Sequence, residues 1–417
     1  MRNKFSYYIY IFIILSSLSF YNPFGLISPQ LSKLLFYLAC ILGIIYAIKN
    51  GISLNKVDYP RSAYRVILIG IIISIFMATI FQKQSFETTA IATLPYFFAY
   101  SLLYTLLKFN IPKPKIEHAI WFFCFMGMGI YIINILTFPK CIFGAEQETF
   151  DMSRGIVRLK INSLQFIVLF LFYSINKWLL TSKKIYIWLL LLTSIFIILS
   201  VTRQYIILSA ILVLIFILNK ASWVTKISSI LFCIIFTLIL LPQIPIYKTM
   251  MELSEDQLQR NKTEKEDIRI TAWKFYVDKY QTNYTTRIFG NGIPAIGKSK
   301  WGDSYEKEVS VKYGGNGCYT TDVGWAGFYW HFGIFPTIGI LYLLLKAALL
   351  PKKEEFRYLS YWCIFIILAS IASGSILYHY QIVYIMTVLY LVYGKERNRN
   401  HLNLNKAYDN RTNNSQL

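Results

Sequence analysis

Long apolar blocks, separated by short clusters of charged residues, constrain this chain more than any other feature of its sequence. The chain is 56% apolar and only 15% charged. A helix that crosses a bilayer needs about 20 apolar residues, and we count about twelve blocks of that kind. They are centred near Phe12, Ala39, Ile72, Phe98, Met126, Leu169, Leu191, Ile211, Ile235, Phe335, Ile364 and Met386. We therefore expect an all-α, polytopic integral membrane protein with about twelve transmembrane helices and no separate soluble domain.

The net charge of +21 would suggest a nucleic-acid partner in a soluble protein, but here it follows the loops. Lysine and arginine collect in cytoplasmic loops of membrane proteins, and every second loop of this chain is rich in them. Those loops contain Lys49, Lys56 and Arg61; Lys108, Lys113 and Lys115; Lys183 and Lys184; Lys220 and Lys226; Lys352, Lys353 and Arg357. We expect both termini in the cytoplasm and no nucleic-acid partner.

This alternation divides the chain into four parts. Residues 1–246 form transmembrane helices 1–9, and residues 247–322 form one long outer loop between helices 9 and 10. Residues 323–394 form helices 10–12, and residues 395–417 form a cytoplasmic tail. The long loop carries twelve basic and eleven acidic residues, and long loops cross the membrane largely regardless of charge.

The apolar run from Ile185 to Asn219 predicts a helical hairpin. As one helix it would be about 52 Å long, too long for a bilayer, and lysines flank both of its ends. The turn should lie outside, near Ser200–Gln204, although neither glycine nor proline marks it. Arg203 is the one charge in the run, and a charge within the bilayer is costly. We favour a functional role for Arg203 over a simple interfacial anchor.

The long loop contains one clear amphipathic helix, which starts at Asp267. An apolar stripe recurs at helical spacing and consists of Ile270, Trp273, Val277 and Tyr280. Arg269 precedes Trp273 by four residues, at the edge of the stripe, where it could face a site. The following sequence runs from Arg287 to Pro294 and contains Gly290 and Gly292. Its backbone N–H groups could take an anion, although a plain turn is the simpler interpretation.

Two further arginines lie in the first outer loop with polar content. Arg154 and Arg158 are four residues apart, so a helix would place them on one face. Such a pair suits a phosphate or an acidic sugar. The alternative, which we favour, is pairing with Glu146, Glu148 or Asp151, or snorkelling at the interface.

Asp322 stands where the long loop returns to an apolar block. It could serve as a general base or as the N-cap of helix 10. His379, on the predicted outer turn between the last two helices, is a competing base. Gly324, Gly327 and Gly333 follow Asp322, and small residues of this kind allow close helix packing.

The cysteines leave one question open. Cys141 and Cys318 both fall in predicted outer loops, where they could form a disulfide or remain two free thiols. The sequence has no metal-type cysteine spacing, no HExxH motif and no evident carboxylate cluster for a metal. We expect neither a metal nor a cofactor.

Part of the chain resembles the O-antigen polymerase and O-antigen ligase superfamily. The matching pieces are the Thr202-Arg203 helix tip, the Arg269-x-x-x-Trp273 helix, Phe289-Gly290-Asn291-Gly292, and the return of the loop into a glycine-bearing helix. The ligases place a histidine, then asparagine, serine or glutamine, and after nine residues Gly-x-x-Gly. Here that spacing gives Asp322, Val323, Gly333 and Pro336, which favours the polymerase branch.

The resemblance implies a GT-C-like, metal-independent glycosyltransferase of O-antigen or capsule assembly in the bacterial inner membrane. Such enzymes transfer a glycan from a polyprenyl pyrophosphate to the hydroxyl of a lipid-linked repeat unit, on the periplasmic face. Arg203 and Arg269 would stabilise the leaving pyrophosphate, and Asp322 would accept the hydroxyl proton. The substrate-binding candidates are Arg154, Arg158, Arg287 and His379.

The resemblance also implies which partners and alternatives to consider. The partners are the polyprenyl-pyrophosphate-linked oligosaccharide, membrane lipid, and flippase and chain-length regulator proteins. An O-antigen ligase is the first alternative. A lipid-linked oligosaccharide flippase is the second, but it needs a polar path through the membrane, and predicted helices 5, 7, 8, 9 and 12 contain almost no polar residues at mid-depth.

Overall fold

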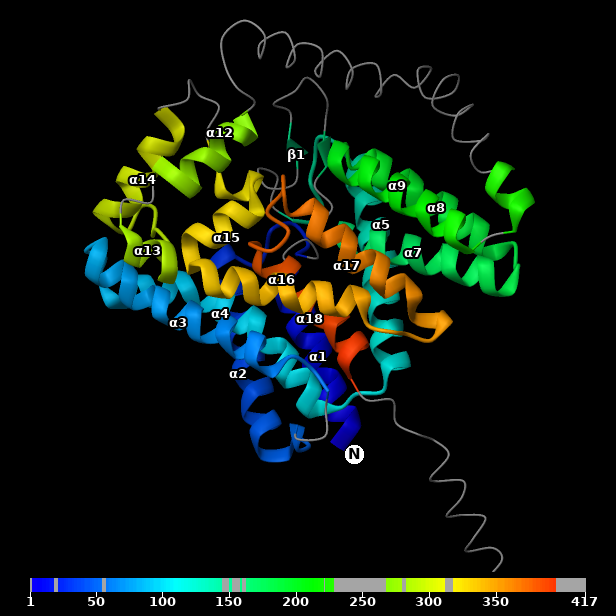
Figure 1. The fold of residues 1–417 in the computed structure, drawn as a ribbon, viewed down its shortest axis with the longest axis horizontal. Helices are drawn as coiled ribbons and strands as arrows, with labels where there is room; N and C mark the ends of the chain where they lie inside the picture. Colours follow the sequence, from blue (N-terminus) through cyan, green and yellow to red (C-terminus); the bar gives the residue numbers. More distant parts are fainter. Residues whose placement is uncertain are drawn as a thin grey trace, which may run out of the picture.

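The structure, a computed structural model, is a bundle of helices of unequal length (Figure 1). It describes residues 2–18, 22–54, 58–144, 150–151, 158–159, 163–220, 222–228, 268–279, 283–311 and 318–394. The helices before the long loop are α1 (Arg2–Ser17), α2 (Pro29–Asn50), α3 (Arg61–Phe81), α4 (Phe86–Phe109), α5 (Lys113–Leu136), α7 (Leu164–Thr181), α8 (Ile185–Leu199) and α9 (Arg203–Lys220). Those after it begin with α12 (Ile268–Lys274), α13 (Tyr284–Phe289) and α14 (Lys300–Val311), and continue with α15 (Gly324–Phe332), α16 (Ile334–Leu349), α17 (Arg357–Ala369) and α18 (His379–Tyr393).

The prediction of a helical membrane protein is confirmed, at a coarser level than twelve spans. Among the described residues, six helices are long and apolar enough to cross a bilayer, namely α2, α3, α4, α5, α7 and α9. Four shorter apolar helices accompany them, α1, α8, α16 and α18. The apolar block centred near Ile235 lies outside the described residues, because residues 229–267 are not described. That range also includes the first part of the long loop.

The hairpin predicted between Ile185 and Asn219 is confirmed. Helix α8 ends at Leu199 and α9 begins at Arg203, so the turn occupies the three residues between them. Val201 adopts a left-handed backbone with φ of 52°, which is uncommon for a β-branched residue. The Ser200 side chain caps the turn by accepting a hydrogen bond from the Thr202 N–H at 3.4 Å. The exact turn residue could not be predicted from the sequence, because this turn contains neither glycine nor proline.

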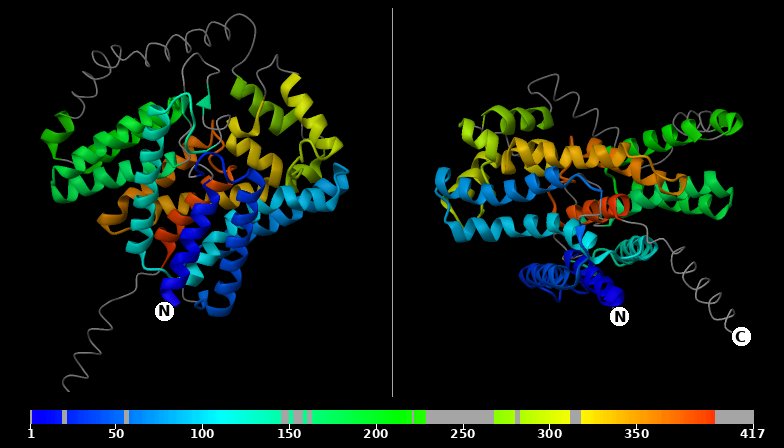
Figure 2. Two further views of the ribbon diagram at one scale, coloured as in Figure 1. Left: turned by 180° about the vertical axis from the view of Figure 1, so that it is seen from behind. Right: turned by 60° about the horizontal axis from the view of Figure 1, so that its bottom comes forward.

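Contacts join the helix ends into two groups, one at each end of the helices. In the first group, Asn176 and Lys220 both bind Glu354, at 3.1 Å and 2.7 Å, and the Tyr390 hydroxyl donates to the Ile111 carbonyl. This group also contains the N-terminus of α1 and the C-terminal end of α18 (Figures 1 and 2).

The second group gathers the opposite helix ends. The Phe24 N–H donates to the Ile142 carbonyl at 2.6 Å, and the Tyr131 hydroxyl donates to the Leu199 carbonyl at 3.0 Å. Each group contains the loops that charge alternation assigns to one side of the membrane. Which side faces the cytoplasm stays a prediction.

Predicted helix 10 is not continuous. It is broken at Gly333, whose φ of 85° ends α15 and begins α16. A side chain at Gly333 would stand 2.2 Å from the Ile288 carbonyl oxygen, so the break lets α13 approach the backbone closely. The glycine that we expected to serve helix packing instead redirects the chain.

A second hydrophobic cluster, separate from the main core, packs the described part of the long loop against α15. Its centre is Trp330 of α15, which is fully buried and stacks on Tyr305 of α14 with ring centroids 5.0 Å apart. Tyr276 lies 5.4 Å from the same ring and hydrogen-bonds the Tyr305 hydroxyl at 2.7 Å. Its hydroxyl also donates to the Cys318 carbonyl. The sequence predicted one amphipathic helix here, and the structure adds α13 and α14.

The predicted stripe on the amphipathic helix is only partly confirmed, because Trp273 and Val277 are half-buried against the second hydrophobic cluster. The side chains that are buried are Ala272, Phe275 and Tyr276, whereas Ile270 is 52% exposed. From Phe275 to Lys279 the helix continues with π-helical geometry, which changes the direction of side chains relative to regular α-helix spacing. Tyr280 lies outside the described residues.

Two short strands interrupt the otherwise helical fold. Strand β1 (Phe150–Asp151) pairs antiparallel with β2 (Arg158–Leu159), and Asp151 lies opposite Arg158. Arg158 is therefore not on a helix with Arg154, contrary to the prediction. Arg154 lies outside the described residues, as does the tail from residue 395.

Candidate active site

Residues 368–378, which comprise the last two residues of α17 and its connection to α18, organise the end of the bundle where the candidate residues lie. Among the described residues, α4 hydrogen-bonds to this segment through Tyr100, and so do three further elements, α9, α12 and the start of α15. Of the residues proposed from sequence for chemistry, Arg203 lies in α9, Arg269 lies in α12, and Asp322 lies two residues before α15. Figure 1 shows the segment between the labels α15 and α17, near the start of α9 and below α12.

Helix α9 reaches this segment directly after Arg203. The Gln204 side-chain amide donates to the Ala369 carbonyl, and the Tyr205 hydroxyl hydrogen-bonds the Ser375 hydroxyl at 2.8 Å. Arg203 is half-buried and is the first residue of α9. Arg203 therefore lies at the end of α9 that hydrogen-bonds to the 368–378 segment.

Helix α12 reaches the segment through Trp273. The Trp273 indole N–H donates to the Ile371 carbonyl at 2.9 Å. Arg269 precedes Trp273 by four residues and is exposed, so the two lie on the same face of α12. The predicted spacing of Arg269 and Trp273 on one helix face is thus retained, and Trp273 contacts the 368–378 segment at this end of the bundle.

The start of α15 packs most closely of the three. The Gly324 and Trp325 N–H groups donate to the Ser373 and Ser370 carbonyls, at 3.1 Å and 3.0 Å. A side chain at position 324 would meet the Ser373 oxygen at 2.2 Å. Only glycine permits this approach, which places Asp322, two residues earlier, at the edge of the segment.

Asp322 itself ends a short 3-10 helix (Thr320–Asp322) and is exposed. The N-cap position of α15 belongs to Val323, so the interpretation of Asp322 as the helix N-cap is wrong. The Asp322 carboxylate lies close enough to Cys318 for its negative charge to disfavour the thiolate form of Cys318. Burial, and then the charge of Asp322, raise the pKa of the Cys318 thiol to about 11.

His379 follows the segment directly, as the first residue of α18. Its ring lies 5.6 Å from the Phe36 ring and 5.8 Å from the Tyr380 ring, measured between centroids. It is therefore held among aromatic side chains at the same end of the bundle as Arg203 and Asp322.

Arg287 belongs to different surroundings. Its guanidinium lies over the Tyr284 ring at 5.6 Å, and α13 packs against α3 and α16. The turn after it also differs from the anion-binding hypothesis. The N–H groups of Asn291 and Gly292 donate to the Trp330 and His331 carbonyls, both at 2.9 Å, so these N–H groups hold the loop on α15 and the plain turn is confirmed.

A buried polar network beneath the 368–378 segment was missed by the sequence analysis. Gln165 of α7 donates to the Tyr205 hydroxyl at 3.4 Å, Tyr205 bonds Ser375, and Ser375 bonds Ser373 at 2.8 Å. The Gln165 side chain is 1% exposed, and its Oε1 has no hydrogen-bond partner among the described residues. Only the presence of glutamine and tyrosine near the ends of apolar blocks could have signalled it.

The disulfide between Cys141 and Cys318 is absent, and both are free thiols. The Cys141 Sγ donates to the Phe143 carbonyl at 3.0 Å, whereas Cys318 is buried in the second hydrophobic cluster. Each thiol thus packs in its own loop. Within the described ranges, no three His, Cys, Asp or Glu side chains lie together as metal ligands.

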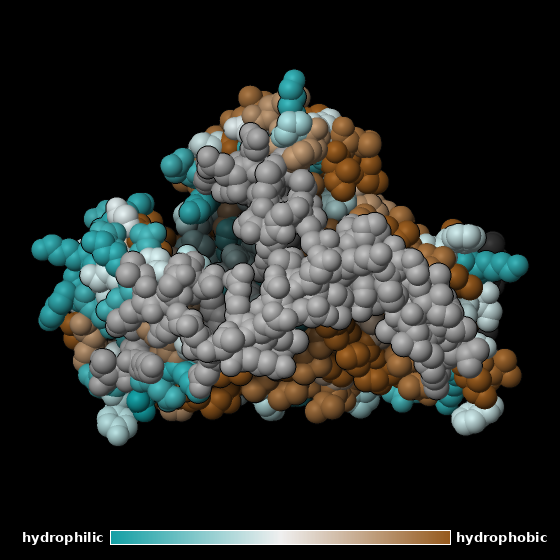
Figure 3. All heavy atoms as spheres, turned by 90° about the horizontal axis from the view of Figure 1, so that it is seen from above, coloured by the Kyte–Doolittle hydropathy of each residue, from teal (hydrophilic) through white to brown (hydrophobic). Residues whose placement is uncertain are grey.

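Part of the surface at this end is hydrophilic, and the surface is hollowed beside that part (Figure 3). Figure 3 looks down on it and shows a hydrophilic lobe on the left, where Figure 1 places α14, beside a recess with hydrophilic atoms at its floor. Apolar surface surrounds the lower flank of the same view. Compared with known proteins, the chain matches no family model and no curated protein.

Proposed function

We propose that this protein is an integral membrane glycosyltransferase that polymerises a surface polysaccharide from polyprenyl-pyrophosphate-linked repeat units. One observation carries the proposal. Three elements that are far apart in sequence all hydrogen-bond to residues 368–378: α9 with Arg203, α12 with Arg269, and the start of α15, two residues after Asp322. Two arginines and a carboxylate next to a lipid-facing bundle are the groups that such a transfer requires.

The proposed reaction moves one glycan and one proton. The acceptor hydroxyl oxygen attacks the anomeric carbon of the donor sugar, and the bond from that carbon to the pyrophosphate oxygen breaks. The pyrophosphate leaves on its polyprenyl chain, and Arg203 and Arg269 stabilise its charge through paired N–H donors. The hydroxyl proton passes to the Asp322 carboxylate, with His379 as the competing acceptor.

The localisation belongs to the same proposal. We place the protein in the bacterial inner membrane, with both termini in the cytoplasm and the 368–378 segment on the periplasmic side. Charge alternation favours this orientation. The division of helix ends into two groups supports it, because α1 begins and α18 ends in the group opposite the candidate site (Figure 2).

The test uses the substrate that the proposal says must accumulate. Lipid-linked glycan is extracted from cells that lack the gene and is incubated with the purified full-length protein in detergent. We expect a ladder of longer lipid-linked chains, and we expect both Arg203→Ala and Arg203→Lys to abolish it, because lysine lacks the fork geometry of arginine. Arg65→Ala, an exposed arginine of α3 in the opposite group of helix ends, is the matched control and should retain the ladder.

Other outcomes favour the alternatives. Transfer of a finished chain to a different acceptor lipid, without elongation, would indicate a ligase. Movement of the lipid-linked glycan across vesicle membranes, without any new glycosidic bond, would indicate a flippase. An unchanged ladder from Arg203→Ala would remove Arg203 from the site.

A further inference from the structure

A basic cavity lies in the opposite group of helix ends, away from the candidate active site. Its volume is about 260 Å³, and its lining residues are Lys4, Tyr7, Tyr8, Lys115 and His118. None of the lining side chains is acidic.

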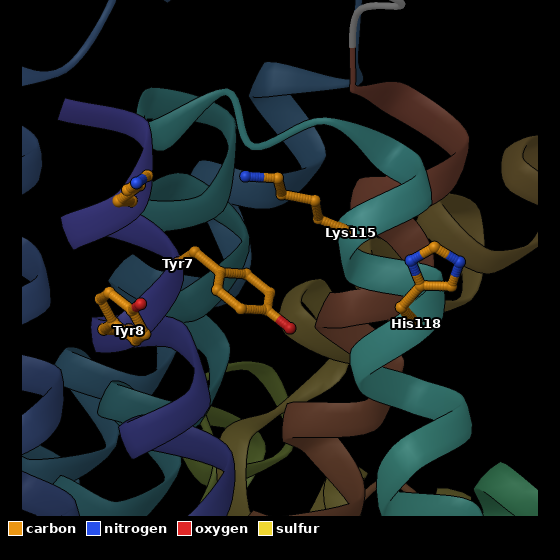
Figure 4. Close-up of a pocket in the computed structure, with 5 residues that line it drawn as sticks. Tyr7, Tyr8, Lys115 and His118 are labelled. Carbon is orange, nitrogen blue, oxygen red and sulfur yellow. The ribbon is translucent and has the colours of Figure 1, made fainter. Parts of the chain in front are cut away.

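The cavity exists because two helices diverge. Helix α1 packs mainly on α2, and α5 packs mainly on α7, while both also contact α18. Tyr7 of α1 and Lys115 of α5 reach into the space between them from opposite sides (Figure 4). The Lys115 ammonium lies 5.9 Å from the centre of the Tyr7 ring. The donors that surround the cavity thus come from two separate helices.

Exposed aromatic residues continue from the cavity along both helices. Phe12 follows Tyr8 by four residues on α1, and Phe122 follows His118 by four on α5, so each lies one helical turn further along. Both are exposed, and Phe122 is 60% exposed. A polar recess at the end of two apolar helix faces matches a molecule with an anionic head and apolar chains.

We propose that this cavity binds the phosphate headgroup of an anionic phospholipid. Lys4 and Lys115 hold the phosphate by charge, the Tyr7 hydroxyl offers a hydrogen bond, and the acyl chains lie along Phe12 and Phe122. Basic pockets between transmembrane helices are suited to such headgroups. A free phosphate ion would use the same donors but would gain nothing from the apolar faces.

The test measures lipid binding directly. Purified full-length protein, delipidated in a neutral detergent, is titrated with dioleoyl-phosphatidylglycerol, with dioleoyl-phosphatidylcholine or with inorganic phosphate, and its thermal unfolding is followed. We expect phosphatidylglycerol alone to raise the unfolding temperature. Lys4→Gln/Lys115→Gln should need about 30-fold more of it for half of the shift, and Lys115→Gln alone about fivefold more. Lys183→Gln/Lys184→Gln, two exposed lysines in the same group of helix ends, should match the wild type.

Three results would overturn the proposal. An equal shift with phosphatidylcholine would mean that the charge is not recognised. An equal loss in the Lys183→Gln/Lys184→Gln control would mean that the effect comes from general surface charge. A shift of the same size with inorganic phosphate would identify a soluble anion, and not a lipid, as the ligand.

Discussion

Replacing Gly324 with alanine tests whether close contact between α15 and the 368–378 segment builds the site. A Cβ atom at this position would stand 2.2 Å from the Ser373 oxygen and 2.9 Å from the Ser370 oxygen. Ordinary contact begins at 3.4 Å, so the overlap with the nearer oxygen is 3.4 − 2.2 = 1.2 Å. Both oxygens belong to the backbone, so neither can move aside as a flexible side chain could.

The energetic cost follows from three effects. Forced backbone shifts of this kind cost about 1–3 kcal/mol, and loss of the hydrogen bond from the Gly324 N–H to the Ser373 carbonyl adds about 1 kcal/mol. Alanine returns up to about 1 kcal/mol through its higher helix propensity. We expect Gly324→Ala to lower the free energy of unfolding by about 1–3 kcal/mol. Because Asp322 shifts with the helix start, we also expect a rate about 100-fold lower, as for a displacement of about 1 Å in other active sites.

The assay combines thermal unfolding in detergent with the chain-length ladder made from extracted lipid-linked glycan. Gly129→Ala is the matched control, because Gly129 lies within α5 and a Cβ there would meet nothing within 4 Å. This control should keep full activity and gain up to about 1 kcal/mol of stability. If Gly324→Ala showed wild-type stability and a wild-type ladder, the close contact would not be what positions Asp322.

Three further predictions concern the base, the second hydrophobic cluster and the thiols. Asp322→Asn should leave abundant, folded protein that makes single repeats only. If His379→Gln alone had that effect, the base assignment would move to His379. Tyr276→Phe should lower the free energy of unfolding by about 1–3 kcal/mol, because the buried Cys318 carbonyl loses its donor; denaturant unfolding measures this, and an unchanged midpoint would contradict it. Maleimide at neutral pH should label Cys141 and leave Cys318 unlabelled, as mass spectrometry of the labelled protein would show. Cys318 is buried, its pKa is raised to about 11, and only the thiolate reacts with maleimide. This pKa lies above the ordinary value of 9.0. The protonated Cys318 thiol therefore contributes its full stabilisation of the fold below pH 9.0. This stabilisation is lost as the pH rises through about 11. Rapid labelling of both thiols at neutral pH would contradict the burial.

The sequence by itself determined the features that depend on local chemistry. Apolar blocks must form helices in a bilayer, because lipid offers no partner for backbone groups. The hairpin of α8 and α9 followed from its length and from the lysines at both ends. Arg203 could be placed at the tip for the same reason, although the turn residue Val201 could not be named. Its left-handed backbone depends on how the two helices meet, and no residue preference records that.

Only the tertiary structure decided which faces and segments meet. The helix from Ile268 presents two adjacent apolar stripes, and Trp330 on α15 selects the one that contains Phe275 and Tyr276. The break at Gly333 depends on the close approach of α13, and the site depends on hydrogen bonds such as that from Gln204 to Ala369. These contacts join residues that are distant in sequence, and hydropathy and helical spacing report only on neighbours along the chain. Periodicity can therefore show that a face is apolar, but the partner that buries it is set by packing across the whole molecule.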